Sequence, residues 1–235
     1  MKADAMDSAS KDPWQDMFPL DEARQATNFL VSTWHRIVKE CPDHLKPSQL
    51  EPALTENFWW HLNETSGPVG RLTGQWSYER HLMELDSATK KLIKRMRMDI
   101  TYFSNAQLPQ LDMVYEFKKL SPESSSRSKY RGKDGLQRFV DGHYAKHQPI
   151  AAMVGMTLKN RADCISKLSA DLGKSTAQTS LSMVANDAGK HVCMPSELFD
   201  AHADFDTQHV RPAGQAWKDG NIRVAHIFLP LPGCT

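Results

Sequence analysis

Two carboxylates and a lysine in the middle of the chain have a spacing that neighbouring strands could bring to one point. Glu116 and Lys118 are two residues apart, so in a strand both side chains project from the same face. Asp99 belongs to the preceding segment, in which polar and apolar residues alternate. A turn at residues 108–110 would fold the two segments into a hairpin and place Asp99 beside Glu116 and Lys118.

This combination of residues favours a metal ion. Two carboxylates at one point repel each other unless a positive charge lies between them. Ligand sets made only of oxygen atoms select hard cations, so we expect Mg²⁺, with Mn²⁺ as a substitute. The main-chain carbonyl of Phe117 could be a third oxygen ligand beside Asp99 and Glu116. Lys118 could then orient or deprotonate a water, or neutralise charge that develops on a phosphate.

The periodicity of apolar residues predicts the helices and strands that would position these groups. Between residues 48 and 158 we expect the order helix, strand, strand, strand, helix, strand. The expected strands are Gln75–Leu85, 94–103, Leu111–Leu120 and 150–158; one helix begins at Ser48, another covers 134–146, and 65–74 and 121–129 are loops. Outside this region we expect helices at Leu20–Glu40 and Arg161–Leu172 and a strand at a sheet edge at 222–229. These elements predict an α/β fold in which helices flank a mixed central sheet.

The order of these elements, together with Asp99 and the tripeptide Glu116-Phe117-Lys118, resembles the PD-(D/E)xK nuclease superfamily. The resemblance covers roughly residues 48–158. It departs from the motif at Met98, where the motif has a proline that many members lack. The resemblance implies a restriction-endonuclease-like α-β-β-β-α-β core with an N-terminal helical segment and a C-terminal extension. The implied reaction is metal-dependent hydrolysis of a phosphodiester, most often in DNA.

The resemblance also implies roles for individual residues. Asp99 and Glu116 would hold the metal ion, and Lys118 would assist the attacking water. An acidic residue on the helix that precedes the sheet often completes such sites. Glu51 is the best match to that residue, and its rivals are Glu56 and Glu79.

Charged residues surround this motif although the whole chain is nearly neutral. Lysine and arginine number 29 against 28 for aspartate and glutamate, so the net charge is 29 − 28 = +1. This balance argues against a histone-like or tail-driven nucleic-acid binder. Phosphate contacts need only a local positive field. We expect that field from the basic residues on both sides of the motif: Lys90, Lys91, Lys94, Arg95, Arg97, Lys119, Arg127, Lys129, Arg131, Lys133 and Arg138.

The length of 235 residues allows one domain of generous size, or a domain plus an arm. We expect a flexible N-terminal arm at residues 1–19, a nuclease-like core at 20–172, and a C-terminal extension at 173–235 packed on that core. No apolar run approaches the roughly 20 residues of a membrane helix, and no secretory signal is visible. The four cysteines form no CxxC pair, so we expect reduced thiols in a cytoplasmic protein.

DNA, preferably duplex, is the expected partner. Cleavage of both strands would favour a homodimer, or a subunit of a larger complex in restriction, phage defence or repair. Two other functions compete with this interpretation. A nucleic-acid-binding or assembly subunit on the same fold would keep the basic residues and would not cut. A hydrolase for a small substrate could use a second cluster, which could also bind zinc or another transition metal: His202, Asp204, Asp206 and His209.

Overall fold

The structure, a computed structural model, describes residues 18–69, 72–85, 89, 92–218 and 220–234. The expected N-terminal arm therefore lies almost entirely outside the described residues. Eight strands of the described part form one mixed open sheet, in the order β1-β2-β3-β4-β8-β7-β5, with β6 paired to β7. The strands are β1 (Gln75–Leu85), β2 (Leu92–Ser104), β3 (Leu111–Leu120), β4 (Ile150–Thr157), β5 (Met183–Val184), β6 (Val192–Cys193), β7 (Phe205–Val210) and β8 (Asn221–Pro230).

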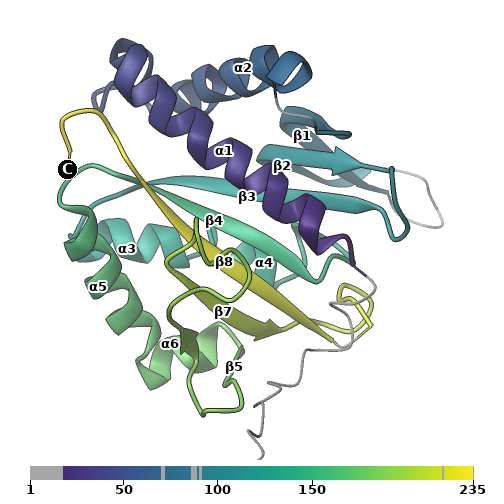
Figure 1. Cartoon of the computed structure of the whole chain (residues 1–235). Coiled ribbons are helices and arrows are strands. Elements are labelled where there is room, and N and C mark those ends of the chain that lie inside the picture. The colour runs from purple at the N-terminus through teal and green to yellow at the C-terminus, as the bar shows by residue number, and fades with distance from the viewer. Residues whose placement is uncertain (1–17, 70–71, 86–88, 90–91, 219, 235) are drawn as a thin grey trace, which may run out of the picture.

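Helices cover both faces of this sheet. On one face lie α1 (Leu20–Glu40) and α2 (Glu51–Val69), which are joined by a short 3-10 helix (Pro42–Leu45). The other face carries α3 (Ser124–Arg131), α4 (Gln137–Val140) and α5 (Arg161–Leu172) (Figure 1). The short helix α6 (Ser175–Ser180) follows α5 in the chain. The α/β class and the mixed sheet expected from the sequence are thus confirmed. None of the helices in the described part of the chain is long and apolar enough to cross a membrane.

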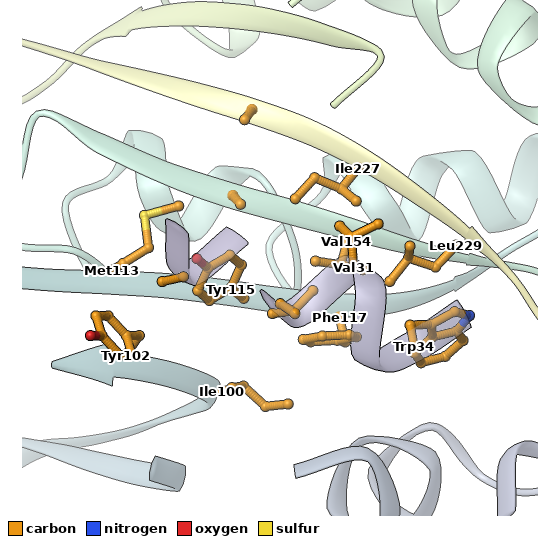
Figure 2. Packing of buried hydrophobic residues seen from close by; sticks show 14 of the residues in the cluster. Val31, Trp34, Ile100, Tyr102, Met113, Tyr115, Phe117, Val154, Ile227 and Leu229 are labelled. Carbon is orange, nitrogen blue, oxygen red and sulfur yellow. The ribbon is translucent and has the colours of Figure 1, made fainter. Parts of the chain in front are cut away.

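The core beneath α1 follows from the alternation of side chains along the strands. Tyr115 and Phe117 on β3 project toward α1, where Trp34 packs against the sheet (Figure 2). Val154 on β4 and Ile227 on β8 extend the same apolar layer. Each large side chain buried in this way stabilises the fold by about 2 kcal/mol. Because successive residues alternate between faces, Glu116 points away from this layer, as the sequence predicted.

Strands β2 and β3 pair only along the first half of β3 and then separate. Strand β2 pairs with β1 along almost all of β1, but its register with β3 runs only from Ile100↔Tyr115 to Ser104↔Leu111. On its other side β3 pairs in parallel with β4 as far as Leu120. Asp99 therefore lies where β2 and β3 separate. The hairpin that the sequence predicted is confirmed. The point at which β2 and β3 separate, here called the fork, is an additional feature.

Two expectations after β3 are wrong. The segment 121–129, expected to be a loop, contains most of α3, because Tyr130 is buried and Arg127 forms an ion pair with Asp171 on α5. Conversely, the helix expected at 134–146 is reduced to α4, and the chain then continues in turns with positive φ angles at Gly142 and Ala145. Tertiary contacts override the weak local preferences of both segments.

Two other boundaries also differ from expectation. Helix α2 continues to Val69 through the first half of the loop expected at 65–74. Strand β8 lies between β4 and β7 in the interior of the sheet, whereas an edge position was expected. His226 on β8 tolerates this burial because it forms hydrogen bonds with Thr207 and Tyr130. The predicted bounds of α1, α5, β1 and β3 are confirmed.

Candidate active site

A pocket of about 600 Å³ opens where β2 and β3 separate. Its walls come from β2, β3, the start of α2 and the segment around α4. Its lining includes the side chains of Glu51, Asp99, Glu116, Lys118, Arg138 and Tyr144. All four residues predicted to act through their side chains, Asp99, Glu116, Lys118 and Glu51, therefore line one pocket.

The fork itself explains why carboxylates gather here. Alternate N–H groups of β3 point toward the edge that β2 leaves, and beyond Tyr115 they lose their strand partner. The Phe117 N–H instead donates to Oδ2 of Asp99 at 2.9 Å, and the Lys119 N–H donates to Oε2 of Glu51 at 2.9 Å. Two carboxylates thus replace the missing strand, which satisfies main-chain donors that would otherwise be costly to bury.

Glu51 reaches this edge because the start of α2 is tied to β3. Nζ of Lys119 donates to the carbonyls of Pro47 at 2.6 Å and Gln49 at 2.9 Å, immediately before the helix begins. The rival Glu56 is exposed on α2 and is not part of the pocket lining. Glu79 adopts a positive φ of 49° on β1 and pairs with Arg97 at 3.0 Å. Among the three candidates, the geometry favours Glu51.

Lys118 lies at the centre of the carboxylates. Its Nζ is 2.9 Å from Oε1 of Glu51, 2.9 Å from Oε1 of Glu116 and 3.9 Å from Oδ2 of Asp99. It also donates to the carbonyl of Phe117 at 2.8 Å. Burial acts to lower the pKa of Lys118, but the three carboxylates outweigh burial and raise that pKa above its usual value. At neutral pH the lysine is therefore held in its protonated form. Of the roles predicted for Lys118, this favours orientation of a water and charge neutralisation over deprotonation of a water.

One lysine does not balance three carboxylates. Burial raises the pKa of Asp99, although Lys118 and the Phe117 N–H oppose the shift. Burial and the nearby Asp99 raise the pKa of Glu116 to about 8, against the opposite effects of Lys118 and Arg138. The side chain of Glu116 is 1% exposed, and its Oε2 finds no hydrogen-bond partner among the described residues. The pocket therefore contains a buried carboxylate oxygen that no donor among the described residues satisfies.

A divalent cation fits this donor set. Oε2 of Glu116 is unused, Asp99 offers a second carboxylate, and the Phe117 carbonyl can accept more than its bond from Lys118. Hard oxygen donors of this kind suit Mg²⁺ or Mn²⁺. Within the part of the chain that the structure describes, no three His, Cys, Asp or Glu side chains form a metal-binding group by themselves. The candidate ligand set is therefore two carboxylates and one main-chain carbonyl.

A cationic wall faces the carboxylates. Arg138 lies with its Nη1 at 3.8 Å from Oε1 of Glu116 and its guanidinium 5.1 Å from the ring centre of Tyr144. It donates to the hydroxyl of Tyr144, which in turn donates to the carbonyl of Arg97. A contact between Arg138 and Tyr144 was not predicted, because residues six apart lie on different sides of a continuous helix. They meet only because the helix ends at Val140.

Several basic residues expected around the motif have structural partners elsewhere. Arg127 and Arg131 bind Asp171 at 2.8 Å and 3.7 Å, and neither lines the pocket. Lys119 holds the start of α2, whereas Arg97 and Lys133 do line the pocket with Arg138. Lys129 is exposed on α3. The expectation for Lys90 and Lys91, and for the side chains of Lys94 and Arg95, lies outside what the structure describes.

The second candidate cluster does not converge on one point. Asp204 pairs with Arg161 at 2.7 Å, and Asp206 accepts hydrogen bonds from Ser196 and two main-chain N–H groups. His209 is buried between Thr207 and the Leu181 carbonyl, away from the hollow beside α1 that His202 and Asp204 line. These contacts use the side chains structurally. They give no support to a metal site or a hydrolase centre there.

Comparison of the chain with protein-family models, with curated proteins and with solved structures found no match. A functional assignment therefore depends on the pocket and on the chemistry of the residues that line it.

Proposed function

We propose that this protein is a Mg²⁺-dependent nuclease that hydrolyses phosphodiester bonds in DNA. The observation that carries the proposal is the convergence of Asp99, Glu116, Glu51 and Lys118 at the fork between β2 and β3. An unused, buried carboxylate oxygen and an adjoining lysine suit a site that binds a cation and a phosphate.

Asp99, Glu116 and the carbonyl of Phe117 would hold Mg²⁺, with Mn²⁺ able to replace it. When bound, the cation would supply Lewis-acid stabilisation of the charge that develops on the phosphate. Glu51 contributes by fixing the lysine, since its two oxygens bind Nζ of Lys118 and the Lys119 N–H. The carboxylates thus have two tasks: holding a cation and positioning an ammonium group.

Lys118 orients the attacking water and donates a hydrogen bond to the reacting phosphate. The raised pKa of its ammonium group keeps its three N–H donors at neutral pH. Since Glu51, Glu116 and the Phe117 carbonyl accept these donors in this structure, bonds to water and phosphate would replace some of those contacts. The water oxygen forms a bond to phosphorus, and the bond between phosphorus and the leaving sugar oxygen breaks. The water gives up a proton to solvent, and the leaving oxygen takes one from solvent. The products are a phosphate monoester and a free hydroxyl.

The order of elements from α2 to β4 supports a restriction-endonuclease-like core for this function. It consists of α2, the strands β1 to β3, the α3–α4 segment and β4, with β3 and β4 parallel. In this proposal residues 20–172 form the nuclease core, and 173–235 form an extension whose strands continue the sheet. A cytoplasmic homodimer, or a subunit of a restriction, defence or repair complex, would allow both strands of a duplex to be cut.

Plasmid cleavage tests the proposal. Wild-type protein, Lys118→Ala and the surface control Lys146→Ala are incubated with supercoiled DNA in Mg²⁺, in Mn²⁺ and in EDTA. We expect nicked or linear DNA with either metal and none in EDTA. The Lys118 variant loses this activity and the Lys146 variant, altered at an exposed position outside the pocket, retains it.

Two results would contradict the assignment in different ways. Cleavage that survives Lys118→Ala would mean that the site lies elsewhere. DNA binding by gel shift without cleavage in any metal would favour the non-cleaving binding subunit.

A further inference from the structure

Arg138 is held more firmly than Arg97 and Lys133, which line the pocket with it and with Lys118. Arg97 is half exposed and pairs with Glu79 at 3.0 Å, and Lys133 is exposed. The guanidinium of Arg138 instead stacks on Tyr144 and donates to the Tyr144 hydroxyl. Its Nε donates to the Lys133 carbonyl at 3.2 Å. The planar group therefore has a fixed orientation at the mouth of the site.

The acidic contacts of Arg138 do not saturate its charge. Asp134 binds Nη2 at 3.3 Å, but that carboxylate is almost fully exposed and its ion pair is correspondingly weak. Glu116 is 3.8 Å from Nη1, beyond hydrogen-bond distance. A cation that would occupy the Glu116 side of the pocket would compete for this carboxylate. With or without that cation, Arg138 faces the pocket with donors available for another anion.

A second arginine supports this wall from behind. Arg211, at the end of β7, is only 4% exposed, and no carboxylate among the described residues pairs with it. Its guanidinium donates to three carbonyls of the segment that carries the wall: Phe139 at 2.8 Å, Tyr144 at 2.5 Å and Ala145 at 2.7 Å. A fourth bond reaches the Gln215 carbonyl at 3.3 Å. These bonds hold the turns that bring Tyr144 back against Arg138.

We propose that Arg138 is the residue that binds the non-bridging oxygens of the substrate phosphate, opposite the carboxylates of the same pocket. A planar guanidinium can donate two parallel hydrogen bonds to a phosphate, which an ammonium group cannot do. The anion enters between Arg138 and Lys118, because the carboxylates repel it from their own side. This inference rests on the proposed nuclease function and assigns the phosphate-binding part of that site.

The test measures binding without catalysis. Full-length wild type, Arg138→Met, Arg138→Lys and the control Lys146→Met are titrated in EDTA against a short fluorescein-labelled DNA duplex, at low salt, by fluorescence anisotropy. We expect Arg138→Met to weaken binding about tenfold, as the loss of a charge-assisted phosphate contact requires. Arg138→Lys should recover only part of the loss, and Lys146→Met should bind within about twofold of wild type.

Thermal unfolding of each variant shows whether the chain remains folded, and Tyr144→Phe provides a milder perturbation. It keeps the stacked ring and removes only the hydroxyl that Arg138 contacts. We expect Tyr144→Phe to bind the duplex with an affinity between those of wild type and Arg138→Met.

Equal affinity of wild type and Arg138→Met would overturn the inference, and so would full recovery by lysine or no binding by wild type. Failure of the nuclease proposal is recognised separately, as an absence of metal-dependent cleavage by a wild-type protein whose binding still depends on Arg138.

Discussion

Two clusters of buried charge lie in this molecule, and their balance is opposite. In the Asp171 cluster, one carboxylate on α5 accepts from Arg127 at 2.8 Å and from Lys174 at 2.6 Å, and Arg131 lies at 3.7 Å. In the pocket cluster, Lys118 lies among Asp99, Glu116 and Glu51, and Arg138 lies at the edge, 3.8 Å from Glu116. One cluster has three cations for a carboxylate, and the other has three carboxylates for a lysine.

The pKa shifts follow this difference. Burial acts to raise the pKa of Asp171, but Lys174, Arg127 and Arg131 outweigh it and lower that pKa below its usual value. In the pocket, burial and like charge raise the pKa of Asp99 and Glu116. Both oxygens of Asp171 have partners, whereas Oε2 of Glu116 has none among the described residues. A saturated cluster stabilises the fold; an unsaturated one costs stability and is the kind of site that binds a ligand.

The largest effect is expected from removing charge in the pocket. Asp99→Asn keeps an oxygen for the Phe117 N–H, and Glu116→Gln keeps the shape of its side chain. Each should reduce metal-dependent cleavage by about a thousandfold, the scale of losing a main electrostatic group. The free energy of unfolding should stay equal or rise, because repulsion is relieved. Initial cleavage rates and urea unfolding of the same preparations check both parts; a clear loss of stability in both variants would contradict the comparison.

The next largest effect is expected in the Asp171 cluster, where removing the carboxylate should reduce stability and leave cleavage unchanged. Asp171→Asn leaves Arg127 and Arg131 without their carboxylate, so the free energy of unfolding should fall by about 3 kcal/mol. Cleavage measured well below the melting temperature should remain near the wild-type rate. A loss under about 1 kcal/mol in urea unfolding would show that this cluster is not the stabilising one.

These responses separate what the sequence could predict from what it could not. The side-chain alternation of β3 correctly placed Glu116 opposite Phe117, because a strand has a fixed period of two. Asp99 and Glu51 were predicted as site residues, but their hydrogen bonds to the N–H groups of Phe117 and Lys119 were not predictable, since nothing local shows that β2 departs from β3 there. The wall formed by Arg138 and Tyr144 depends on hydrogen bonds from Arg211, some 70 residues away. Long-range contacts decided those features.

The two clusters should also respond to pH with opposite sign. Glu116 has a raised pKa in the folded chain, so the folded state keeps a proton that the unfolded state releases above about pH 4.5. Its contribution to stability is therefore greatest at low pH and is lost as the pH rises toward about 8. Asp171 has a lowered pKa, so its contribution is present above about pH 4 and is lost on further acidification.

Urea unfolding of wild type and Glu116→Gln across this range isolates the first effect as the difference between the two curves. A difference that grows in favour of wild type as the pH rises would contradict the assigned direction.

The smallest effect concerns the support of Glu51. Lys119→Met removes the ammonium group that holds the carbonyls of Pro47 and Gln49 but leaves the Lys119 N–H to bind Glu51. We expect a decrease in cleavage of about three- to tenfold through misplacement of Glu51, far less than for Lys118→Ala. Cleavage rates of Lys118→Ala and Lys119→Met, measured in parallel, check that the first variant loses more activity than the second. Equal losses would mean that Lys118 also acts only by holding the structure.

Calorimetric titration with Mn²⁺ and Mg²⁺ tests the central claim most directly, because it asks whether the unsaturated cluster binds a cation. Wild type and Asp171→Asn should each bind a single cation, and Glu116→Gln should lose that binding while remaining folded. Binding of equal affinity in Glu116→Gln, or no binding by wild type at millimolar metal, would contradict the assignment of this pocket as a metal-dependent nuclease site.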